Sequence, residues 1–198
     1  MKNYIYVFGL LLLPVMAEAQ NNFLGLSWNI SIPTASSTSF VDETSIRGGQ
    51  FEFRDFIQSN LSVGLSLGWN AYQEYTPRQT YPIENGAVTT DLTKYTYTLP
   101  ILFNVHYYYP VSEYVMPYIS AGMGGMYSER EIFFNVYGIA EYKWGFAFRP
   151  ELGVVFPFGE GFGAILAADY LMATNDSDEL NINSTSSFNF RVGFLLIR

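Results

Sequence analysis

Apolar and polar residues alternate along two long segments of the chain. In residues 23–32 the apolar positions are Leu24, Leu26, Trp28, Ile30 and Ile32, and those between them are glycine, serine or asparagine. In residues 61–72 the apolar positions are Leu61, Val63, Leu65, Leu67, Trp69 and Ala71. Successive side chains of a β-strand point to opposite faces, so this period of two predicts strands with one apolar face and one polar face.

Further segments carry the same signal less regularly and bring the number of predicted strands to eight. They are residues 46–56, 92–106, 117–127, 144–156, 162–172 and 187–197. Most have the ~9–11 residues that a tilted strand needs to cross a bilayer. The predicted connections alternate between short ones, at 57–60, 108–116 and 157–161, and longer ones, at 33–45, 73–91, 128–143 and 173–186. This alternation is typical of a membrane barrel with short inner turns and long outer loops.

The polar face of the predicted strands consists largely of glycine, serine, asparagine and threonine. Charged residues make up 14% of the chain and aromatic residues 18%, whereas soluble domains carry roughly 25% charged residues. Small, uncharged side chains fit a narrow lumen better than a water-facing surface. We therefore predict an all-β fold, an eight-stranded antiparallel up-and-down transmembrane β-barrel. A soluble lipocalin-type barrel, with its apolar face inward, is the alternative.

The beginning of the chain has the features of an export signal. Lys2 supplies a positive charge, residues 5–15 form an apolar run, and Ala17-Glu18-Ala19 is a typical cleavage site. The apolar run is shorter than the ~20 residues of a spanning helix, which argues against a membrane anchor. We predict a signal peptide over residues 1–19 and a single outer-membrane β-barrel domain over residues 20–198, located in the bacterial outer membrane.

Net charge and cysteine content exclude several classes of function. The formal net charge of −8 argues against nucleic-acid partners, because these require a basic surface. The chain has no cysteine, which excludes disulfides, a thiol nucleophile and a cysteine-based metal site. No catalytic motif, cofactor site or metal site is predicted.

Seven charged residues fall on the predicted inward face and form a predicted polar network in the lumen. They are Glu52, Arg54, Lys94, Arg149, Glu151, Asp169 and Arg191. An eight-stranded barrel leaves room for little more than side chains, so these groups are expected to pair and plug the lumen. A proton or ion path through the same residues is the functional alternative.

Aromatic residues gather near the predicted strand ends, as in the belts of membrane barrels. Those predicted at the outer rim are Tyr72, Tyr95, Tyr97, Tyr127 and Trp144. The residues predicted to make extracellular contacts are Tyr75, Phe133, Phe134 and Tyr137. The apolar loop that holds the last three either extends its hairpin as a sheet edge or lies against lipid. The one histidine, His106, is expected near the periplasmic end as a hydrogen-bonded rim residue rather than a catalytic base.

Two segments resemble a known group of proteins. Residues 97–102, Tyr-Thr-Leu-Pro-Ile-Leu, and residues 117–124, Pro-Tyr-Ile-Ser-Ala-Gly-Met-Gly, are similar to strands of small outer-membrane barrels. That group includes OmpX, the OmpA transmembrane domain and the PorT-like outer-membrane β-barrel domain. The resemblance implies a fold and a location, and these motifs carry no chemistry. Because proline lacks an amide donor, we predict a bulge or an irregular hydrogen bond at Pro100.

Taken together, the sequence predicts a non-enzymatic outer-membrane barrel with a plugged polar lumen. It would act in envelope integrity or bind a partner through its extracellular loops. The alternatives are a narrow channel for small solutes, a PorT-like component of a secretion or motility assembly, and an enzyme acting on envelope lipid. Expected contacts are outer-membrane lipid, lipopolysaccharide and an extracellular or envelope protein, with the chain as a monomer and without a cofactor.

Overall fold

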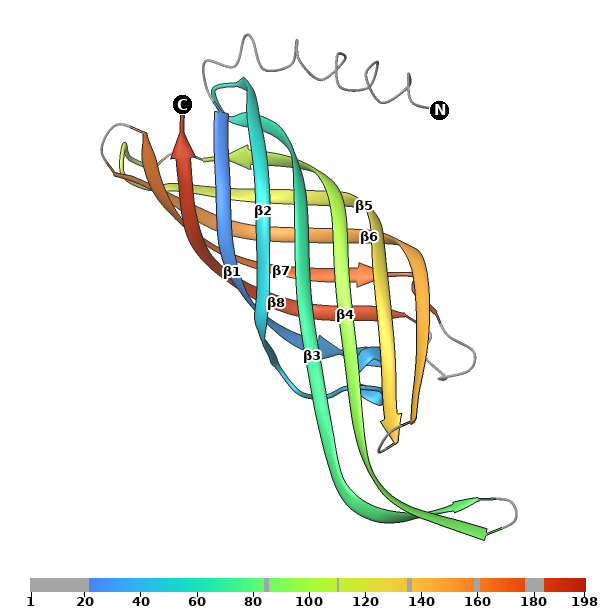
Figure 1. Ribbon diagram of the computed structural model, residues 1–198. Helices are drawn as coiled ribbons and strands as arrows, with labels where there is room; N and C mark the ends of the chain where they lie inside the picture. Colours follow the sequence, from blue (N-terminus) through green and yellow to red (C-terminus); the bar gives the residue numbers. More distant parts are fainter. Residues whose placement is uncertain (1–21, 84–85, 110, 135–136, 159–160, 177–183) are drawn as a thin grey trace, which may run out of the picture.

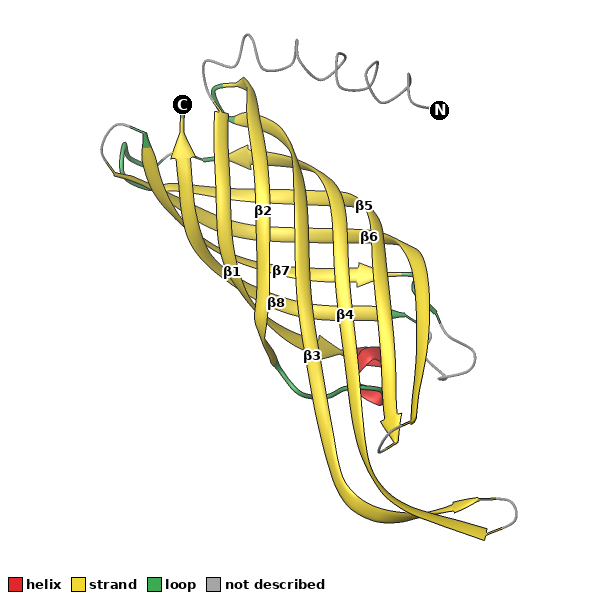
Figure 2. Ribbon diagram, viewed as in Figure 1, coloured by secondary structure: helices red, strands yellow, loops and turns green. Residues whose placement is uncertain are grey.

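The computed structural model describes residues 22–83, 86–109, 111–134, 137–158, 161–176 and 184–198, and the predicted signal peptide lies outside them. Eight antiparallel strands form one closed barrel in the order β1 to β8 (Figures 1 and 2). The strands are β1 Asn22–Thr34, β2 Ser45–Gln58, β3 Leu61–Ile83, β4 Gly86–Tyr108, β5 Met116–Phe134, β6 Tyr137–Phe158, β7 Phe162–Ala173 and β8 Thr185–Ile197, and a 3-10 turn, η2, covers Ala35–Ser39. Among these residues no helix is long and apolar enough to cross a membrane. The predicted fold class is confirmed.

The apolar face of the strands points outward. Ser62 and Ser66 are 0% and 3% exposed, whereas Leu65 between them is 58% exposed. The same alternation of buried polar and exposed apolar side chains runs along β1 and β8. A soluble barrel would reverse this order, so the lipocalin-type alternative is wrong.

Strands β3 to β6 continue beyond the barrel at one end (Figure 1). This end lies opposite the one where β1 begins and β8 ends. Pairing of β2 with β3 ends at Gly49 and Trp69, and pairing of β6 with β7 begins at Ala147 and Ala173. The four strands extend beyond these pairings, which close the barrel. We use the name protruding sheet for their outer parts, residues 73–83, 86–95, 129–134 and 137–143. The prediction of loops over 73–91 and 128–143 is therefore wrong over most of their length. Threonine, tyrosine and valine favour extended backbone in these segments.

Two prolines interrupt the barrel ladders without shifting the register. The β3–β4 ladder pairs Leu67 with Ile101 and then Asn70 with Thr98, so the pairing opposite Pro100 is missing. The β6–β7 ladder has the same gap beside Pro150. Pro100 thus lies at an irregular hydrogen bond, as predicted, and no bulge forms there.

The lumen is filled in layers. Near the termini an apolar floor consists of Phe23, Tyr108, Tyr118, Val155, Ile165 and Leu195. A second apolar layer lies further along the lumen and consists of Leu102, Met126, Ala147, Leu171 and Ala173. At the far end an apolar cap follows η2 and consists of Phe40, Val41 and Tyr72. Charged side chains fill the space between the floor and the second layer.

Candidate functional site

Six buried charged side chains form an ionic cluster in the middle of the lumen. They are Glu52, Arg54, Arg149, Glu151, Asp169 and Arg191, and each is at most 3% exposed. They come from β2, β6, β7 and β8, whose alternation turns these positions inward. With three arginines and three carboxylates, the formal charges of the cluster cancel.

Glu151 lies at the centre of the ionic cluster. Its carboxylate is 3.7 Å from Arg54 Nη2 and 3.6 Å from Arg149 Nη2, and it also pairs with Arg191. Arg54 Nη2 is 2.8 Å from Glu52 Oε1, and Arg191 Nε is 3.1 Å from Asp169 Oδ2. Every arginine therefore has a carboxylate partner. Such pairing is what makes burial of a charge tolerable in a medium of low dielectric constant.

Uncharged polar side chains complete the ionic cluster. Arg54 donates to the hydroxyls of Tyr108 at 2.8 Å and Tyr118 at 3.0 Å, and Tyr118 donates to Glu151 at 2.6 Å. Arg149 donates to Asn104 Oδ1 at 3.0 Å and also to Gln50. These uncharged partners were not predicted, because the predicted network comprised only the charged residues of the inward face.

Lys94 lies apart from the ionic cluster, although the sequence predicted it there. Its Nζ is 3.6 Å from Glu74 Oε1 and 5.6 Å from the centre of the Phe40 ring, at the cap. Both side chains of this pair are partly exposed, at 21% and 25%. Alternation predicted the correct face of β4, but it does not predict a residue's height along the barrel.

His106 lies inside the lumen beside the apolar floor. It is 1% exposed, its Nδ1 is 3.3 Å from Ser62 Oγ, and its ring packs against Tyr118 at 5.8 Å between ring centres. The hydrogen bond of His106 was predicted. Its position was not, because the residue lies inside the lumen rather than at the rim. Tyr72, expected at the outer rim, is also buried in the lumen, and its hydroxyl is 2.5 Å from Ser31 Oγ.

The far end of the lumen is closely filled. Beneath the cap, a cavity of about 20 Å³ is bounded by Pro33, Val41, Tyr72, Thr96 and Ser186 among others. A space of this size holds about one water molecule. At the other end, rings of the floor meet edge to face, with 4.8 Å between the centres of Phe23 and Phe56.

Asn175, from the connection between β7 and β8, ties the barrel to the base of the protruding sheet. Its Nδ2 lies within 3.0 Å of Met126 O, Ser128 Oγ and Lys143 O. The main-chain carbonyl oxygen of Asn175 accepts a hydrogen bond from Arg130 Nη2 at 2.7 Å. A Cβ at Gly145 would clash with Asn175, so glycine is required at that position. No local sequence signal predicts this long-range contact.

The protruding sheet carries the predicted extracellular contact residues. Tyr75 is 55% exposed, and Phe133 and Phe134 are 37% and 36% exposed. Phe133 packs edge to face on Tyr95, which stacks with Tyr97. The side chain of Tyr137 lies outside the described residues. Of the two alternatives for this segment, the structure shows the extended hairpin.

One known protein family covers nearly the whole chain. The family described as outer membrane protein beta-barrel domain matches residues 6–194. The chain belongs to this family. An outer membrane protein β-barrel domain resides in the bacterial outer membrane, where its apolar outer wall contacts lipid. No curated protein sequence matches the chain.

Solved structures similar to this outer membrane protein β-barrel domain share its fold at low sequence identity. Neisserial surface protein A has a TM-score of 0.57 and 10% identity, covering 88% of this chain and 96% of that one. Ail, the attachment invasion locus protein of Yersinia pestis, solved with the heparin analogue sucrose octasulfate, has a TM-score of 0.50 and 14% identity, with coverage of 90% and 97%. Outer membrane protease OmpT from Escherichia coli has a TM-score of 0.50 and 9% identity, with coverage of 91% and 98%.

Outward charges of the β-barrel domain mark the limits of its lipid-facing band. Near one end of β2, Asp55 points outward because its neighbour Arg54 points inward. Near the other end, exposed Arg47 points outward beside buried Gly48. On β5, Glu129 follows the Tyr127–Trp144 aromatic pair, whose ring centres are 5.5 Å apart. Charges on the lipid face are costly at the centre of a bilayer and tolerated near its interfaces. The protruding sheet therefore stands outside the hydrocarbon.

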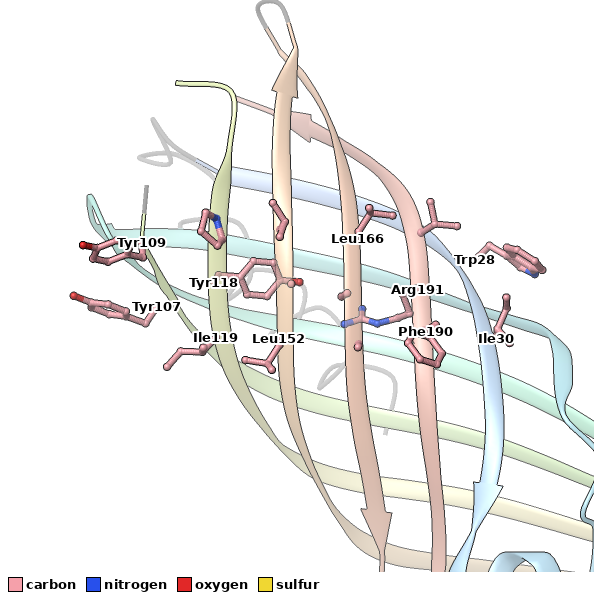
Figure 3. A pocket seen from close by; sticks show the side chains of 16 residues that line it. Trp28, Ile30, Tyr107, Tyr109, Tyr118, Ile119, Leu152, Leu166, Phe190 and Arg191 are labelled. Carbon is pink, nitrogen blue, oxygen red and sulfur yellow. The ribbon is translucent and has the colours of Figure 1, made fainter. Parts of the chain in front are cut away.

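An apolar hollow lies on the outer wall of the β-barrel domain (Figure 3). It has a volume of about 860 Å³ and extends over β1 and β4 to β8. Large side chains border it, including Trp28, Tyr107, Leu152 and Phe190, while Ala168 and Gly153 contribute little bulk. Because it lies on the lipid-facing wall, it is part of the surface that acyl chains cover.

Among the described residues, no group of three or more His, Cys, Asp or Glu could hold a metal ion.

Proposed function

We propose that this protein is a non-enzymatic, non-conducting outer-membrane barrel that binds a partner outside the cell through its protruding sheet. The observation that carries the proposal is the closure of the lumen. A neutral ionic cluster lies between the apolar floor and the second apolar layer, with the cap beyond. A lumen filled in this way over the described residues argues against the channel alternative.

The position of the one histidine supports a role without catalysis. His106 is 1% exposed and its ring packs against Tyr108 and Tyr118, beneath the surface that a substrate could reach. An imidazole that acts as a general base must lie within hydrogen-bond reach of the substrate proton. We therefore assign His106 to packing and hydrogen bonding in the lumen.

The protruding sheet supports the binding part of the proposal. It holds exposed aromatic residues on paired strands beyond the lipid-facing band, among them Tyr75, Phe133 and Phe134. Aromatic side chains supply large contact areas at a low entropic cost. Strands also hold them in fixed positions, which favours recognition of a specific partner. A PorT-like role in an assembly would use the same surface.

Photo-crosslinking in intact cells tests the proposal. A photoreactive amino acid is placed at Tyr75 or Phe134, and a matched control carries it at Leu26, which is 61% exposed on the lipid-facing wall. We expect one discrete protein adduct from the positions on the sheet and none from Leu26. No protein adduct from either sheet position, or the same adducts from all three, contradicts the proposal.

A further inference from the structure

A small cleft opens on the outward side of the wall where β2 and β3 part. The last register pair between these strands is Gly49 with Trp69, and β3 then runs on past the outer end of β2 (Figure 1). The cleft has a volume of about 220 Å³, and Arg47, Gln73 and Tyr75 are among the residues that line it. Its two walls are therefore parts of the barrel sheet, which hold these side chains in fixed positions.

A bulge in β2 turns Arg47 toward this cleft. The β1–β2 ladder shifts by one residue between its Asn29 and Ser31 positions, so β2 carries an extra residue there. As a result Ile46 and Arg47, although neighbours in sequence, are both exposed. Trp28 Nε1 donates to Ile46 O at 2.7 Å and holds the bulge in place. Bulges are common at barrel rims, where they re-aim a side chain toward a functional site.

Arg47 is suited to bind an anionic group in the cleft. Its Nη1 donates to Gln73 Oε1 at 3.0 Å, which positions the guanidinium against the β3 wall. No carboxylate of the described residues forms an ion pair with it, whereas Arg54, Arg149 and Arg191 of the ionic cluster each have one. A guanidinium presents five N–H donors in a planar fork that matches two oxygens of a phosphate. A phosphate group is therefore the ligand that this side chain fits best.

The other residues around the cleft are suited to a sugar. Tyr75 lines the cleft and is 55% exposed. On the next strand Tyr95 and Tyr97 lie on the same outward face, with their ring centres 6.2 Å apart in a stack. Aromatic faces pack against the C–H face of a sugar ring. Glu43 and Thr44 also line the cleft and supply oxygens for hydrogen bonds with sugar hydroxyls.

The cleft lies at the outer limit of the lipid-facing band. Trp69, in the last register pair of β2 and β3, is 46% exposed on the lipid-facing wall, and Arg47 stands just beyond it. The cleft is thus continuous with a surface that acyl chains cover. Lipid head groups of the outer leaflet stand at this level, and in the bacterial outer membrane these include the phosphorylated sugars of lipopolysaccharide.

We propose that the cleft between β2 and β3 binds the phosphorylated sugar head group of lipopolysaccharide from the surrounding outer leaflet. Arg47 binds the phosphate, Tyr75 packs against the sugar ring, and Glu43 accepts hydrogen bonds from its hydroxyls. The acyl chains of the same molecule lie along the wall below, beside Trp69. This site goes beyond the proposed function, because its ligand is a lipid of the same membrane rather than a protein outside the cell.

Native mass spectrometry of the purified protein, released from detergent micelles, measures binding with lipid A as the probe. We expect saturable binding of bisphosphorylated lipid A, about tenfold or more tighter than binding of dephosphorylated lipid A, because charge-assisted hydrogen bonds to the phosphate are lost. Inorganic phosphate at the same concentration should not displace lipid A, since it lacks the sugar and the acyl chains. Equal affinity for the two forms of lipid A, equal affinity for phosphatidylglycerol, or displacement by inorganic phosphate overturns the proposal.

Substitution of Arg47 tests the phosphate contact. Arg47→Met should weaken binding of bisphosphorylated lipid A about tenfold or more and should leave binding of the dephosphorylated form unchanged. Arg47→Lys keeps the charge without the planar fork and should restore part of the affinity. The matched control Arg78→Met removes another exposed arginine, in the protruding sheet and outside the cleft, and should leave binding unchanged. Equal effects of Arg47→Met and Arg78→Met would show a general attraction between charges and overturn the site.

Substitution of Tyr75 tests the sugar contact. Tyr75→Ser should weaken binding of both forms of lipid A about threefold or more, because the aromatic face is lost. The control Tyr142→Ser removes a tyrosine that is 58% exposed on β6, away from the cleft, and should have no effect. Unchanged binding in Tyr75→Ser overturns the assignment of the sugar.

The two proposals fail separately. Crosslinking from Phe134 in intact cells reports on the protein partner and does not involve the cleft. Titration of the purified protein with lipid A reports on the cleft alone, so a negative result there overturns the head-group site and leaves the proposed function standing.

Discussion

The barrel lumen and the protruding sheet, which continues four of its strands, differ in how they treat most charged residues. At the base of the sheet Arg130 is still only 3% exposed and pairs with Glu141. In the lumen, Arg191 contacts Asp169, Glu52 and Glu151, and all four side chains are at most 3% exposed. In the protruding sheet, Lys94 has Glu74 as its ion-pair partner, and water reaches both. A buried charge must be matched, whereas an exposed one is stabilised by solvent. Closure of the barrel, more than the alternation of residues, thus determines where charge balance is strict.

The largest effect should follow from unbalancing the ionic cluster. Arg191→Met removes the arginine paired with Asp169 and one of the three arginines paired with Glu151. We therefore expect a loss of about 3–5 kcal/mol in the free energy of unfolding. Urea unfolding of the protein folded in lipid vesicles, followed by tryptophan fluorescence, measures it. The control Arg47→Met removes an exposed arginine that donates to Gln73 at 3.0 Å, and should cost less than about 1 kcal/mol.

A second change sharpens this result. Arg191→Met combined with Asp169→Asn removes one charge of each sign and restores the balance of the cluster. We expect the double variant to be more stable than Arg191→Met alone by about 1 kcal/mol or more. Equal losses for Arg47→Met and Arg191→Met would mean that the lumen charges are solvated, which contradicts a closed lumen.

A smaller effect is expected at the junction between the two regions. Asn175→Ala removes the amide that reaches Met126 O, Ser128 Oγ and Lys143 O. Loss of these buried hydrogen bonds should cost about 2–3 kcal/mol in the same unfolding experiment. Thr80→Ala, which removes an exposed contact with Thr89, should change stability by about 0.5 kcal/mol or less. If Asn175→Ala is equally mild, the junction does not depend on this residue.

The protruding sheet itself should contribute little to the stability of the barrel. Thr76 and Leu92 are register partners, so an Asn-Gly turn can replace residues 77–91 and close a shorter hairpin. We expect the shortened protein to fold, with a change of about 1 kcal/mol or less, because the removed part lies beyond the point where β2 stops pairing with β3. Vesicle refolding and urea unfolding measure this. Failure to fold would show that the two regions are not independent.

The smallest effect is expected for the exposed ion pair. Lys94→Met removes the partner of Glu74, at 3.6 Å and partly exposed, so the loss should be about 0–1 kcal/mol and should shrink in high salt. Unfolding curves at low and high ionic strength test it. A salt-independent loss comparable with that of Arg191→Met would place Lys94 energetically in the ionic cluster, as the sequence had suggested.

Much of the barrel could be predicted from the chain because alternation is a local property. Ser62 and Leu65 lie on the faces that the period of two predicts, and six of the seven charged residues meet in the lumen. The same rule also placed Lys94 inward, but strands β3 to β6 run past the barrel, and alternation does not say where closure ends. Tyr72 was predicted at the rim because it lies near a predicted strand end. It is two residues from buried Asn70, however, so both side chains point to the same inward face.

The protruding sheet was harder to predict because polar β-strands resemble loops in composition. Residues 73–91 contain Pro77, Pro82 and four threonines, a composition that is common in loops as well. The Asn85-Gly86 dipeptide in the middle of that segment is a strong hairpin signal and could have revealed the long β3–β4 pair. The contacts of Asn175 depend on long-range geometry, and nothing near it in the chain predicts them.

Ion conductance across a planar lipid bilayer tests the central claim most directly. We expect the purified wild-type protein, shown by electrophoretic mobility to be folded, to insert without producing conductance steps, because the ionic cluster and the apolar layers fill the lumen. Steady wild-type conductance that is abolished or changed in ion selectivity by Arg149→Met would contradict a closed lumen. It would instead make the ionic cluster part of an ion path.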